Sequence, residues 1–404
     1  FKSATEPFRY NKMSDQNRLQ LHEFLDNLYL TLLNDVSDSR KISVDSLRAI
    51  AYRYDGQTAD GSVKSGLIDG IMYPDEFSDM IKKKVGLKSK DDLEKITLGE
   101  YAGAKPIVGD FGSKDKIALV YAEGGIEDGD GKNGTIGGDK YAQMIKKLRM
   151  DENVKAIVLR VNSPGGSALA SDLIWREIEM AKKAKIPVIV SMGDYAASGG
   201  YYIACNADSI LAEPNTLTGS IGVFALLPNA RKLMNEKLGI TFDTVATGPN
   251  AIGISPFAAT NPDQDRMIQS WIDNTYERFL DHVSKGRKMT RDQVHEIAQG
   301  RIWTGDKAVQ LGLVDRLGTL DDAIKIAAKM AKVDKYRVSE YPRPKNQIMQ
   351  IMEELMGKSD EEDDVKSKLI QSTFKEYASM YNFLRDVQKM QGPQARLPFY
   401  LEIK

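Results

Sequence analysis

Histidine and cysteine are scarce in this chain, which has three histidines and one cysteine among 404 residues. A single cysteine excludes a disulfide framework within the chain, and the lack of a histidine and cysteine cluster gives no support for zinc. His22, His282 and His295 lie outside every motif discussed below, in stretches expected to be helical. We therefore expect surface or packing histidines, and a Ser–His–Asp arrangement has poor support. Cys205 lies in an apolar run and is expected to be a small buried residue.

An excess of charge is also missing, because 56 basic and 57 acidic residues give a formal net charge of −1. The charges are spread along the chain, so the sequence has no electrostatic footprint for binding nucleic acid. Apolar residues make up 42% of the chain, which is enough for one large or two medium domains with real cores.

Long apolar runs are missing as well. No stretch approaches the roughly eighteen residues that a bilayer-spanning helix needs. The chain begins with Phe1 and not with methionine, so we interpret it as part of a longer precursor. The absence of a signal or anchor within it therefore says little about the native protein.

An internal repeat is present. Residues 24–43, FLDNLYLTLLNDVSDSRKIS, align without a gap to residues 271–290, WIDNTYERFLDHVSKGRKMT. The match continues from residues 66–77 onto residues 312–323. Self-similarity of this kind indicates a duplicated structural unit. We expect the first hundred residues to be the tail of a first copy, whose earlier part precedes Phe1.

An α/β pattern lies between the two repeat tails. Short β-branched runs suited to buried strands cover residues 116–121, 155–161, 187–192, 209–212 and 242–246. Helical segments are expected near residues 138–149, 167–184, 199–206 and 223–237, and helices dominate from 262 to 332. The alternation favours parallel strands joined by crossover helices.

The chain is predicted to have three parts. Residues 1–105 are the helical end of the first repeat, residues 106–335 the second repeat, and residues 336–404 a helical tail. In this tail the acidic run 359–364 is interpreted as a solvated linker, and an amphipathic segment over 369–387 as a docking face.

The stretch MGDYAASGGYYIA, residues 192–204, places Ser198 after a strand and a tight GDYAA turn, at the start of a short helix. A hydroxyl there is exposed where backbone N–H groups favour developing negative charge. Taken alone, the motif is more typical of a serine that simply starts a helix.

Two further motifs follow strands. In NSPGGSALAS, Gly165 and Gly166 allow the backbone to turn and approach a ligand, and two glycine amides suit an oxyanion hole. In NTLTGSIGVF, Thr218 and Ser220 lie on a turn, where their hydroxyls can orient a neighbouring amine. Each motif alone is also explained by ordinary turn chemistry.

The glycine-rich stretch 124–138 carries no phosphate-binding G-K-[ST] signature, and Lys132 takes a position where a calcium loop needs an oxygen ligand. We expect a flexible loop there.

In this order, the motifs NSPGGS, MGDYAASGGYYIA and LTGSIGVF resemble the signal peptide peptidase A family, also called protease IV, in its long bacterial form with two repeats. The resemblance covers residues 1–335. It implies an α/β fold of the Clp-protease and crotonase type with repeated β-β-α units, in a tandem repeat whose first copy is only partly present. It also implies a serine–lysine dyad.

The repeat helps to choose the lysine. Aligning the copies backwards places Lys2 roughly at Asn250. In the short relatives with one repeat, the family lysine lies in this region of the copy that carries the serine. Here that copy has Asn250, whereas Lys2 lies within KSATEPF, which resembles the lysine motif of the long type.

The resemblance thus implies that Ser198 is the nucleophile, Lys2 the base, and the Gly166 and Gly199 amides the oxyanion hole, with Ser220 bonded to the lysine. It further implies hydrophobic peptide substrates such as signal peptides, and a homo-tetramer attached to the inner membrane and facing the periplasm. No cofactor, metal or nucleic acid is expected. Two alternatives stay open: an acyl-CoA enzyme of the crotonase type, and a non-catalytic oligomeric scaffold.

Overall fold

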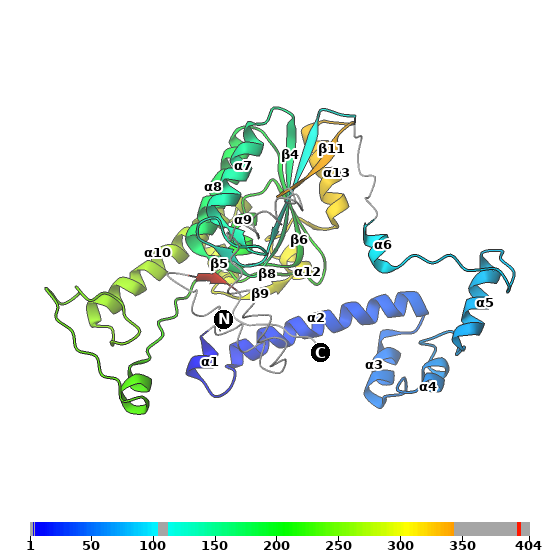
Figure 1. Ribbon diagram of the computed structural model, residues 1–404, viewed down its shortest axis with the longest axis horizontal. Helices are drawn as coiled ribbons and strands as arrows, with labels where there is room; N and C mark the ends of the chain where they lie inside the picture. The colour runs from blue at the N-terminus through cyan, green and yellow to red at the C-terminus, as the bar shows by residue number, and fades with distance from the viewer. Residues whose placement is uncertain (1–2, 4, 104–111, 343–393, 397–404) are drawn as a thin grey trace, which may run out of the picture. The chain divides into compact units, whose positions relative to one another are not determined.

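The computed structural model describes residues 3, 5–103, 112–342 and 394–396. Contacts divide the chain into two compact units, residues 23–109 and the remainder. The larger unit contains the α/β region (Figure 1). The predicted boundaries after residues 105 and 335 stay predictions, and two described strands, β11 and β12, lie within the segment 336–404 that was expected to be helical.

The main sheet of the larger unit has the strand order β10-β7-β6-β4-β1-β11, with β8 beside β6 and β9 beside β8. All of these pairs are parallel except β8–β9. The strands are β1 (Lys116–Glu123), β4 (Val154–Ser163), β6 (Val188–Ala197), β7 (Ser209–Ala212), β8 (Leu217–Gly219), β9 (Ile302–Thr304), β10 (Arg316–Leu317) and β11 (Arg337–Tyr341). The α/β class with parallel crossovers is therefore confirmed.

Alternate residues of the central strands face two helical layers. Ile117 and Leu119 of β1 pack with the buried face of α13, whereas Ala118 and Val120 pack with the core under α7, α8, α9 and α10 (Figure 1). A period of two along a strand places successive side chains on opposite faces, so both faces of this sheet are covered. The helices are α7 (Gly138–Met150), α8 (Ala168–Lys183), α9 (Gly199–Ala204), α10 (Pro262–Arg287), α11 (Arg291–Ile297), α12 (Gly305–Gln310) and α13 (Leu320–Ala331).

A second, small sheet has the order β12-β5-β2-β3. Its strands are β2 (Ile126–Glu127), β3 (Ile136–Gly137), β5 (Gly165–Ser167) and β12 (Gln394–Arg396). Each long strand β1 and β4 is thus followed by short strand pieces and then by a helix, α7 or α8. This is the repeated β-β-α arrangement that the family resemblance implied.

The smaller unit is helical over its described residues. It holds the second part of α2 (Asp15–Arg40) and then α3 (Val44–Arg53), α4 (Ala59–Lys64), α5 (Pro74–Lys84) and α6 (Leu98–Gly103). The short helix α1 (Glu6–Arg9) and the first turns of α2 belong to the larger unit.

The repeat seen in the sequence is present in the structure. Helices α2 and α10 both contain 26 residues, and each is followed by a lysine with positive φ, Lys41 or Lys288. Arg40 donates from Nε to the Gly66 carbonyl oxygen at 2.9 Å, and Arg287 donates to the Gly312 carbonyl oxygen at the same distance. In each copy, therefore, an equivalent arginine connects the end of a long helix to a later glycine by a hydrogen bond.

Four local predictions are wrong. Residues 242–246 form no strand, because they pair with no strand among the described residues and Val245 is fully exposed. The helix expected over 223–237 is reduced to 231–237, including the π-helix η1 (Leu233–Lys237). Residues 193–197 continue β6, since 195–197 pair with β8. The expected flexible loop 124–138 contains β2 and β3, which pair through buried Ile126 and Ile136.

The acidic run 359–364 and the amphipathic segment 369–387 lie outside the described residues. Within the part of the chain that is described, no helix combines the length and the apolar composition needed to cross a membrane.

Candidate active site

Ser198 lies at the junction between β6 and α9, with φ 55° and ψ −114°. Few residues other than glycine adopt such a backbone, and sharp strand-to-helix turns of this kind present nucleophilic serines in hydrolases. The Ser198 N–H donates to the Gly219 carbonyl oxygen at 2.8 Å, and its own carbonyl accepts from Tyr202 N–H at 2.8 Å. The turn is therefore fixed by β8 on one side and by the helix on the other.

Two buried tyrosines anchor the helix that follows Ser198. The Tyr201 hydroxyl donates to the Leu313 carbonyl oxygen at 2.8 Å, and the Tyr202 hydroxyl donates to Asp172 Oδ1 at 2.8 Å. Burial raises the pKa of both phenols far above the ordinary value, so both stay protonated donors. The short helix α9 thus depends on tertiary contacts more than on its own length.

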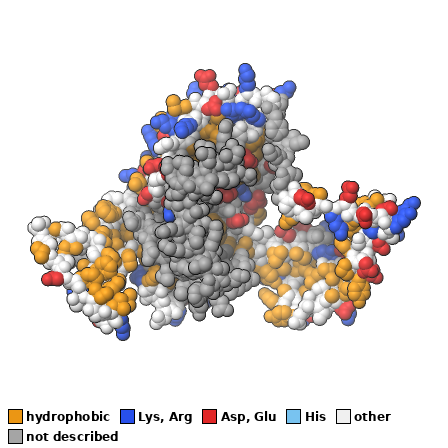
Figure 2. Space-filling model, in the orientation of Figure 1, with side chains coloured by type: hydrophobic (Ala, Val, Ile, Leu, Met, Phe, Trp, Pro, Cys, Tyr) orange, Lys and Arg blue, Asp and Glu red, His pale blue; other side chains and the backbone are white. Residues whose placement is uncertain are grey.

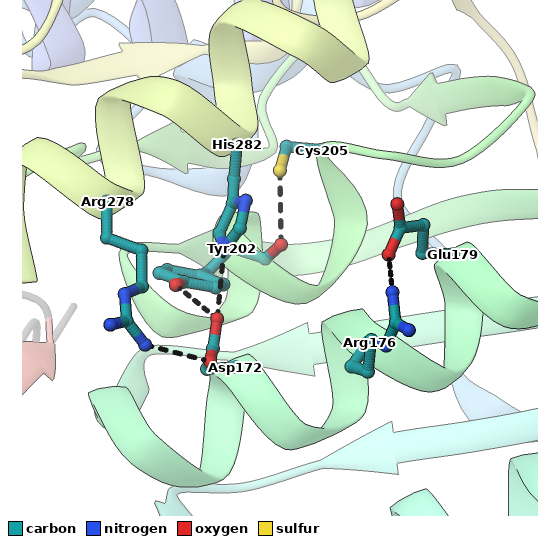
Figure 3. Close-up of polar contacts among 7 residues, drawn as sticks. All are labelled: Asp172, Arg176, Glu179, Tyr202, Cys205, Arg278 and His282. Atoms are coloured by element: carbon teal, nitrogen blue, oxygen red, sulfur yellow. Dashed lines mark hydrogen bonds and ion pairs between the residues drawn. The ribbon is translucent and has the colours of Figure 1, made fainter.

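Asp172 on α8 is the centre of a polar cluster beneath α9 (Figure 3). Besides the Tyr202 hydroxyl, it contacts His282 Nε2 at 2.9 Å and Arg278 at 3.3 Å, both from α10. Burial opposes the charge of Asp172, but hydrogen bonds from His282 and Tyr202 outweigh it and hold the pKa of this carboxyl below its usual range. The His282 ring stacks on Trp175, with 3.5 Å between ring centroids.

These contacts give His282 a packing role, which agrees with the sequence analysis. His295 contacts the Tyr276 hydroxyl at 3.0 Å, also away from the three motifs. Cys205 ends α9 and is fully buried, with its thiol 3.2 Å from the Tyr202 carbonyl oxygen. Burial raises the pKa of this thiol to about 12, so it is no nucleophile at neutral pH.

The two glycines that follow β4 make close backbone approaches, Gly165 to the N-terminus of α9 and Gly166 to β2. A β-carbon added at Gly165 would lie 2.7 Å from the Gly199 amide nitrogen, and Gly165 has φ 96°. The Gly165 N–H donates to the buried Ser163 hydroxyl at 3.1 Å, which fixes the end of β4. A β-carbon at Gly166 would lie 2.0 Å from the Ile126 carbonyl oxygen, so any side chain there would displace β2. The structure therefore brings Gly165 close to Gly199, whereas the other predicted oxyanion residue, Gly166, packs against β2.

The third motif forms the opposite wall of the Ser198 turn. Thr218 donates its hydroxyl to the Ala196 carbonyl oxygen at 2.8 Å, and Ser220 donates its N–H to the Arg301 carbonyl oxygen at 2.8 Å. Ser220 is fully buried and has φ 47°. Because Gly219, its neighbour, accepts the Ser198 N–H, the backbone places Ser220 next to the turn at Ser198.

Lys2 lies outside the described residues, but its neighbour Ser3 is described and buried. Buried Gln20 on α2 donates to the Ser3 hydroxyl at 3.3 Å and accepts the Ile302 N–H at 3.5 Å. Ile302 pairs with Gly219 on β8. Ser3 is therefore linked through Gln20 and β9 to β8, the strand whose Gly219 accepts the Ser198 N–H.

Glu6 organises the same terminal segment. Its carboxylate accepts from the Ser14 hydroxyl at 2.5 Å and from Asn17 Nδ2 at 3.0 Å, and these bonds hold its pKa below the usual range against the opposing effect of burial. The sequence analysis assigned no role to Glu6, which lies within the KSATEPF motif, or to Gln20, which follows it on α2. Asn250, the residue matched to Lys2 in the second copy, accepts from Asn261 Nδ2 at 2.8 Å before α10.

Comparisons with known proteins identify the family of the chain. The sequence model of peptidase family S49 matches residues 1–88 and 180–334, two segments that each contain one copy of the repeat tail. Protease 4 of Salmonella typhi is 37% identical over 88% of this chain and 58% of its own length. A protein of Enterococcus faecium named "Putative signal peptide peptidase SppA" is 35% identical over 62% of this chain and 73% of its own length.

A solved structure of a ClpP1 variant from Listeria monocytogenes is 17% identical, with a TM-score of 0.35, and its alignment covers 51% of this chain and 94% of that one. The chain spans little more than half the length of the Protease 4 relatives that it matches.

Proposed function

Because the chain belongs to peptidase family S49, we propose that it forms the nucleophile-bearing part of a serine endopeptidase that cleaves hydrophobic peptides. The observation that carries the proposal is the backbone of Ser198, which holds a strained conformation between β6 and a helix anchored by buried tyrosines. A strained position of this kind persists only where the surrounding structure enforces it, and such positions cluster at functional sites.

The proposed reaction is acyl transfer through a serine–lysine dyad. The Ser198 oxygen attacks the peptide carbonyl carbon while the neutral Lys2 amine takes the hydroxyl proton. The N–H groups of Gly166 and Gly199 stabilise the resulting oxyanion. Lys2 then gives the proton to the leaving amine of the substrate as the C–N bond breaks. In the second step the neutral Lys2 amine deprotonates a water molecule, which hydrolyses the acyl-enzyme. Ser220 accepts or donates a hydrogen bond to orient the lysine.

The assignment of Lys2 is supported by the way its neighbours are held. Ser3 is buried and bonded to Gln20, and Glu6 closes the turn that follows through Ser14 and Asn17. A base needs a fixed position within hydrogen-bond reach of the hydroxyl. In this proposal the first repeat supplies the base and the second the nucleophile.

The two alternatives receive less support. A crotonase-type acyl-CoA enzyme needs catalytic carboxylates after its glycine turns, whereas here Ser198 occupies the start of α9, and Ser167 and Ala168 follow Gly165 and Gly166. A non-catalytic scaffold does not require a serine in a strained backbone conformation, nor the close backbone approaches of Gly165 and Gly166. Family membership favours the peptidase over both.

We further propose that the substrates are remnant signal peptides, and that the protein acts as a homo-tetramer at the periplasmic face of the bacterial inner membrane. The oligomer is supported by large apolar side chains that are exposed along residues 227–257, including Leu238, Phe242 and Val245. Figure 2 shows apolar side chains gathered over this segment at the lower left. Exposed apolar patches of this kind mark interaction surfaces.

The test uses the intact protein and an internally quenched hydrophobic peptide. Ser198→Ala should abolish hydrolysis without lowering the melting temperature, because one oxygen contributes little packing. Ser209→Ala is the matched control: Ser209 is also buried and its hydroxyl bonds to no described residue, so activity should be retained. Wild-type turnover by Ser198→Ala would refute the nucleophile assignment.

The base is tested separately. Lys2→Ala should be as inactive as Ser198→Ala, and the double variant hardly worse, because the two groups act as one unit. The wild-type rate should rise with pH through an ionisation well below about 10.4, the ordinary lysine value. Near-full activity of Lys2→Ala with an unchanged pH profile would show that another residue is the base.

A further inference from the structure

Gln20 is a buried glutamine in the first part of α2, the part that lies against β9 (Figure 1). It is only 2% exposed, although most of its neighbours on this stretch of the helix are in solvent. A buried amide costs free energy unless its N–H groups and its carbonyl oxygen find hydrogen-bond partners. The partners of the Gln20 amide therefore indicate what this side chain does.

Both ends of this amide are bonded. Its nitrogen Nε2 donates to Asn17 Oδ1 at 3.0 Å and to the Ser3 hydroxyl oxygen at 3.3 Å. Its oxygen Oε1 accepts the Ile302 N–H at 3.5 Å, which is the longest of the three contacts. One buried side chain thus joins the segment around Ser3 to β9.

The direction of these hydrogen bonds is fixed from both ends. The Glu6 carboxylate, which is ionised at neutral pH and can only accept, accepts from Asn17 Nδ2 at 3.0 Å. Asn17 therefore presents its oxygen to Gln20. A backbone N–H can only donate, so Ile302 requires the oxygen of the Gln20 amide. The nitrogen of this amide is then left to donate to Ser3.

The β9 end of this connection belongs to the backbone that supports the candidate site. Ile302 pairs with Gly219, whose carbonyl oxygen accepts the Ser198 N–H at 2.8 Å. Arg301, which precedes Ile302, accepts the Ser220 N–H at 2.8 Å. The amide is therefore bonded to the short stretch of chain that positions both serines.

The other end belongs to the segment that carries the proposed base. Ser3 is 3% exposed, and its carbonyl oxygen accepts the Glu6 N–H at 3.0 Å at the start of α1. Lys2 directly precedes Ser3 in the sequence, and neighbouring Cα atoms are about 3.8 Å apart. A fixed Ser3 therefore limits the positions that the lysine side chain can reach.

We infer that Gln20 is a positioning residue for the base, Lys2. Its amide holds the segment around Ser3 against β9, so that the lysine amine stays within reach of the Ser198 hydroxyl. The inference rests on the proposed peptidase function and adds to it a residue that acts only through others. Because an amine is neutral near physiological pH only where water is excluded, loss of this contact should change the pH dependence of catalysis.

The kinetic test removes the amide in the intact protein. In Gln20→Leu the lysine should spend more time in water, so the midpoint of the plot of kcat against pH should rise by about one unit towards 10.4. Below the wild-type midpoint kcat should then fall about tenfold, and the loss should shrink as the pH is raised. Gln16→Leu, at an exposed site on the same helix, is the matched control and should leave the profile unchanged.

A milder variant removes only one of the three contacts. Ser3→Ala deletes the hydroxyl that accepts from Gln20 and should move the midpoint in the same direction. The double variant Gln20→Leu/Ser3→Ala should show no further shift, because both changes break the same connection. A loss of kcat that is equal at every pH would show a merely structural role and would overturn the inference.

Hydrogen exchange separates this inference from the proposed chemistry. The backbone amides of α1 should exchange several times faster in Gln20→Leu than in wild type, and at the wild-type rate in Gln16→Leu. Mass spectrometry of a peptic peptide that covers Glu6–Arg9 measures this without any turnover. Absence of peptidase activity in the wild type would refute the proposed function and leave the exchange result valid. Unchanged exchange in Gln20→Leu, or faster exchange with an unchanged pH midpoint, would refute the positioning role.

Discussion

Ser198 combines a side chain with a backbone conformation that glycine adopts most easily. Alanine at this position keeps the unfavourable contact between Cβ and the backbone, whereas glycine removes it. We therefore expect Ser198→Gly to be more stable than Ser198→Ala by about 1 kcal/mol, after the extra entropy of glycine in the unfolded chain is subtracted. Urea unfolding of the two inactive variants measures the difference.

The matched comparison uses Ser163, a buried serine in extended backbone at the end of β4. There Ser163→Gly should be less stable than Ser163→Ala, the reverse order. The same order at both positions would mean that the turn at Ser198 stores no strain.

Single residues were identified from the sequence to different degrees. The sequence singles out Ser198 as a candidate because three motifs follow one another at strand ends, yet its positive φ has no signature in A-S-G-G. Gln20 was missed because a glutamine on a long helix is ordinary until its partners, Ser3 and Ile302, are known. Contacts between residues almost 300 positions apart depend on the folded chain.

The anchoring of α9 gives a prediction for the element. Asp172→Asn removes the charge that holds the Tyr202 hydroxyl, His282 and Arg278 together. We expect a loss of about 2 kcal/mol at pH 7, typical of a buried charged hydrogen-bond partner, and a lower kcat because Ser198 begins α9. Thermal unfolding and peptide turnover measure the two effects.

The pH dependence of this anchor follows from the lowered pKa of Asp172. A carboxyl whose pKa is lower in the folded than in the unfolded chain stabilises the fold above about pH 4 and loses this contribution as the pH falls through the folded value. The difference in melting temperature between wild type and Asp172→Asn should therefore shrink on acidification from pH 5 to pH 3. Asp139→Asn, at an exposed site on α7, serves as the control. A constant difference would exclude the charge as the cause.

Strands and helices were predicted well where burial is regular. The runs at 116–121, 155–161 and 209–212 became β1, β4 and β7 because both faces of the sheet are covered, and continuous apolar runs mark such strands. Residues 242–246 also contain aromatic and β-branched residues, but they pair with no described strand. The three residues of β12 are too short and too polar for any periodic signal, so their pairing with β5 had no signature in the sequence.

At the scale of the whole molecule, the repeat allows one interaction to be compared in two settings. Arg287 is 7% exposed and contacts Asp315, which also accepts the Ile210 N–H at 2.7 Å. Arg40 is 26% exposed, and its partner Asp69 is almost entirely in solvent. We expect Arg287→Ala to destabilise the fold by about 3 kcal/mol, because it leaves a partly buried carboxylate without its partner.

Arg40→Ala serves as the internal comparison and should cause a clearly smaller loss, because exposed ion pairs contribute little. Thermal unfolding followed by circular dichroism measures both variants. Equal losses would show that the shared glycine contact, and not the ion pair, carries the stability in both copies.

Cys205 is a natural probe of local opening around α9. It is the sole thiol of the chain and ends the helix that starts at Ser198, and it is fully enclosed by the core. A thiol reagent reaches such a sulfur only during a transient opening of its surroundings, so the labelling rate reports how often that opening occurs. Without any introduced probe, the time course of labelling thus measures how often the surroundings of α9 open, and any peptide that stabilises this helix will slow the labelling.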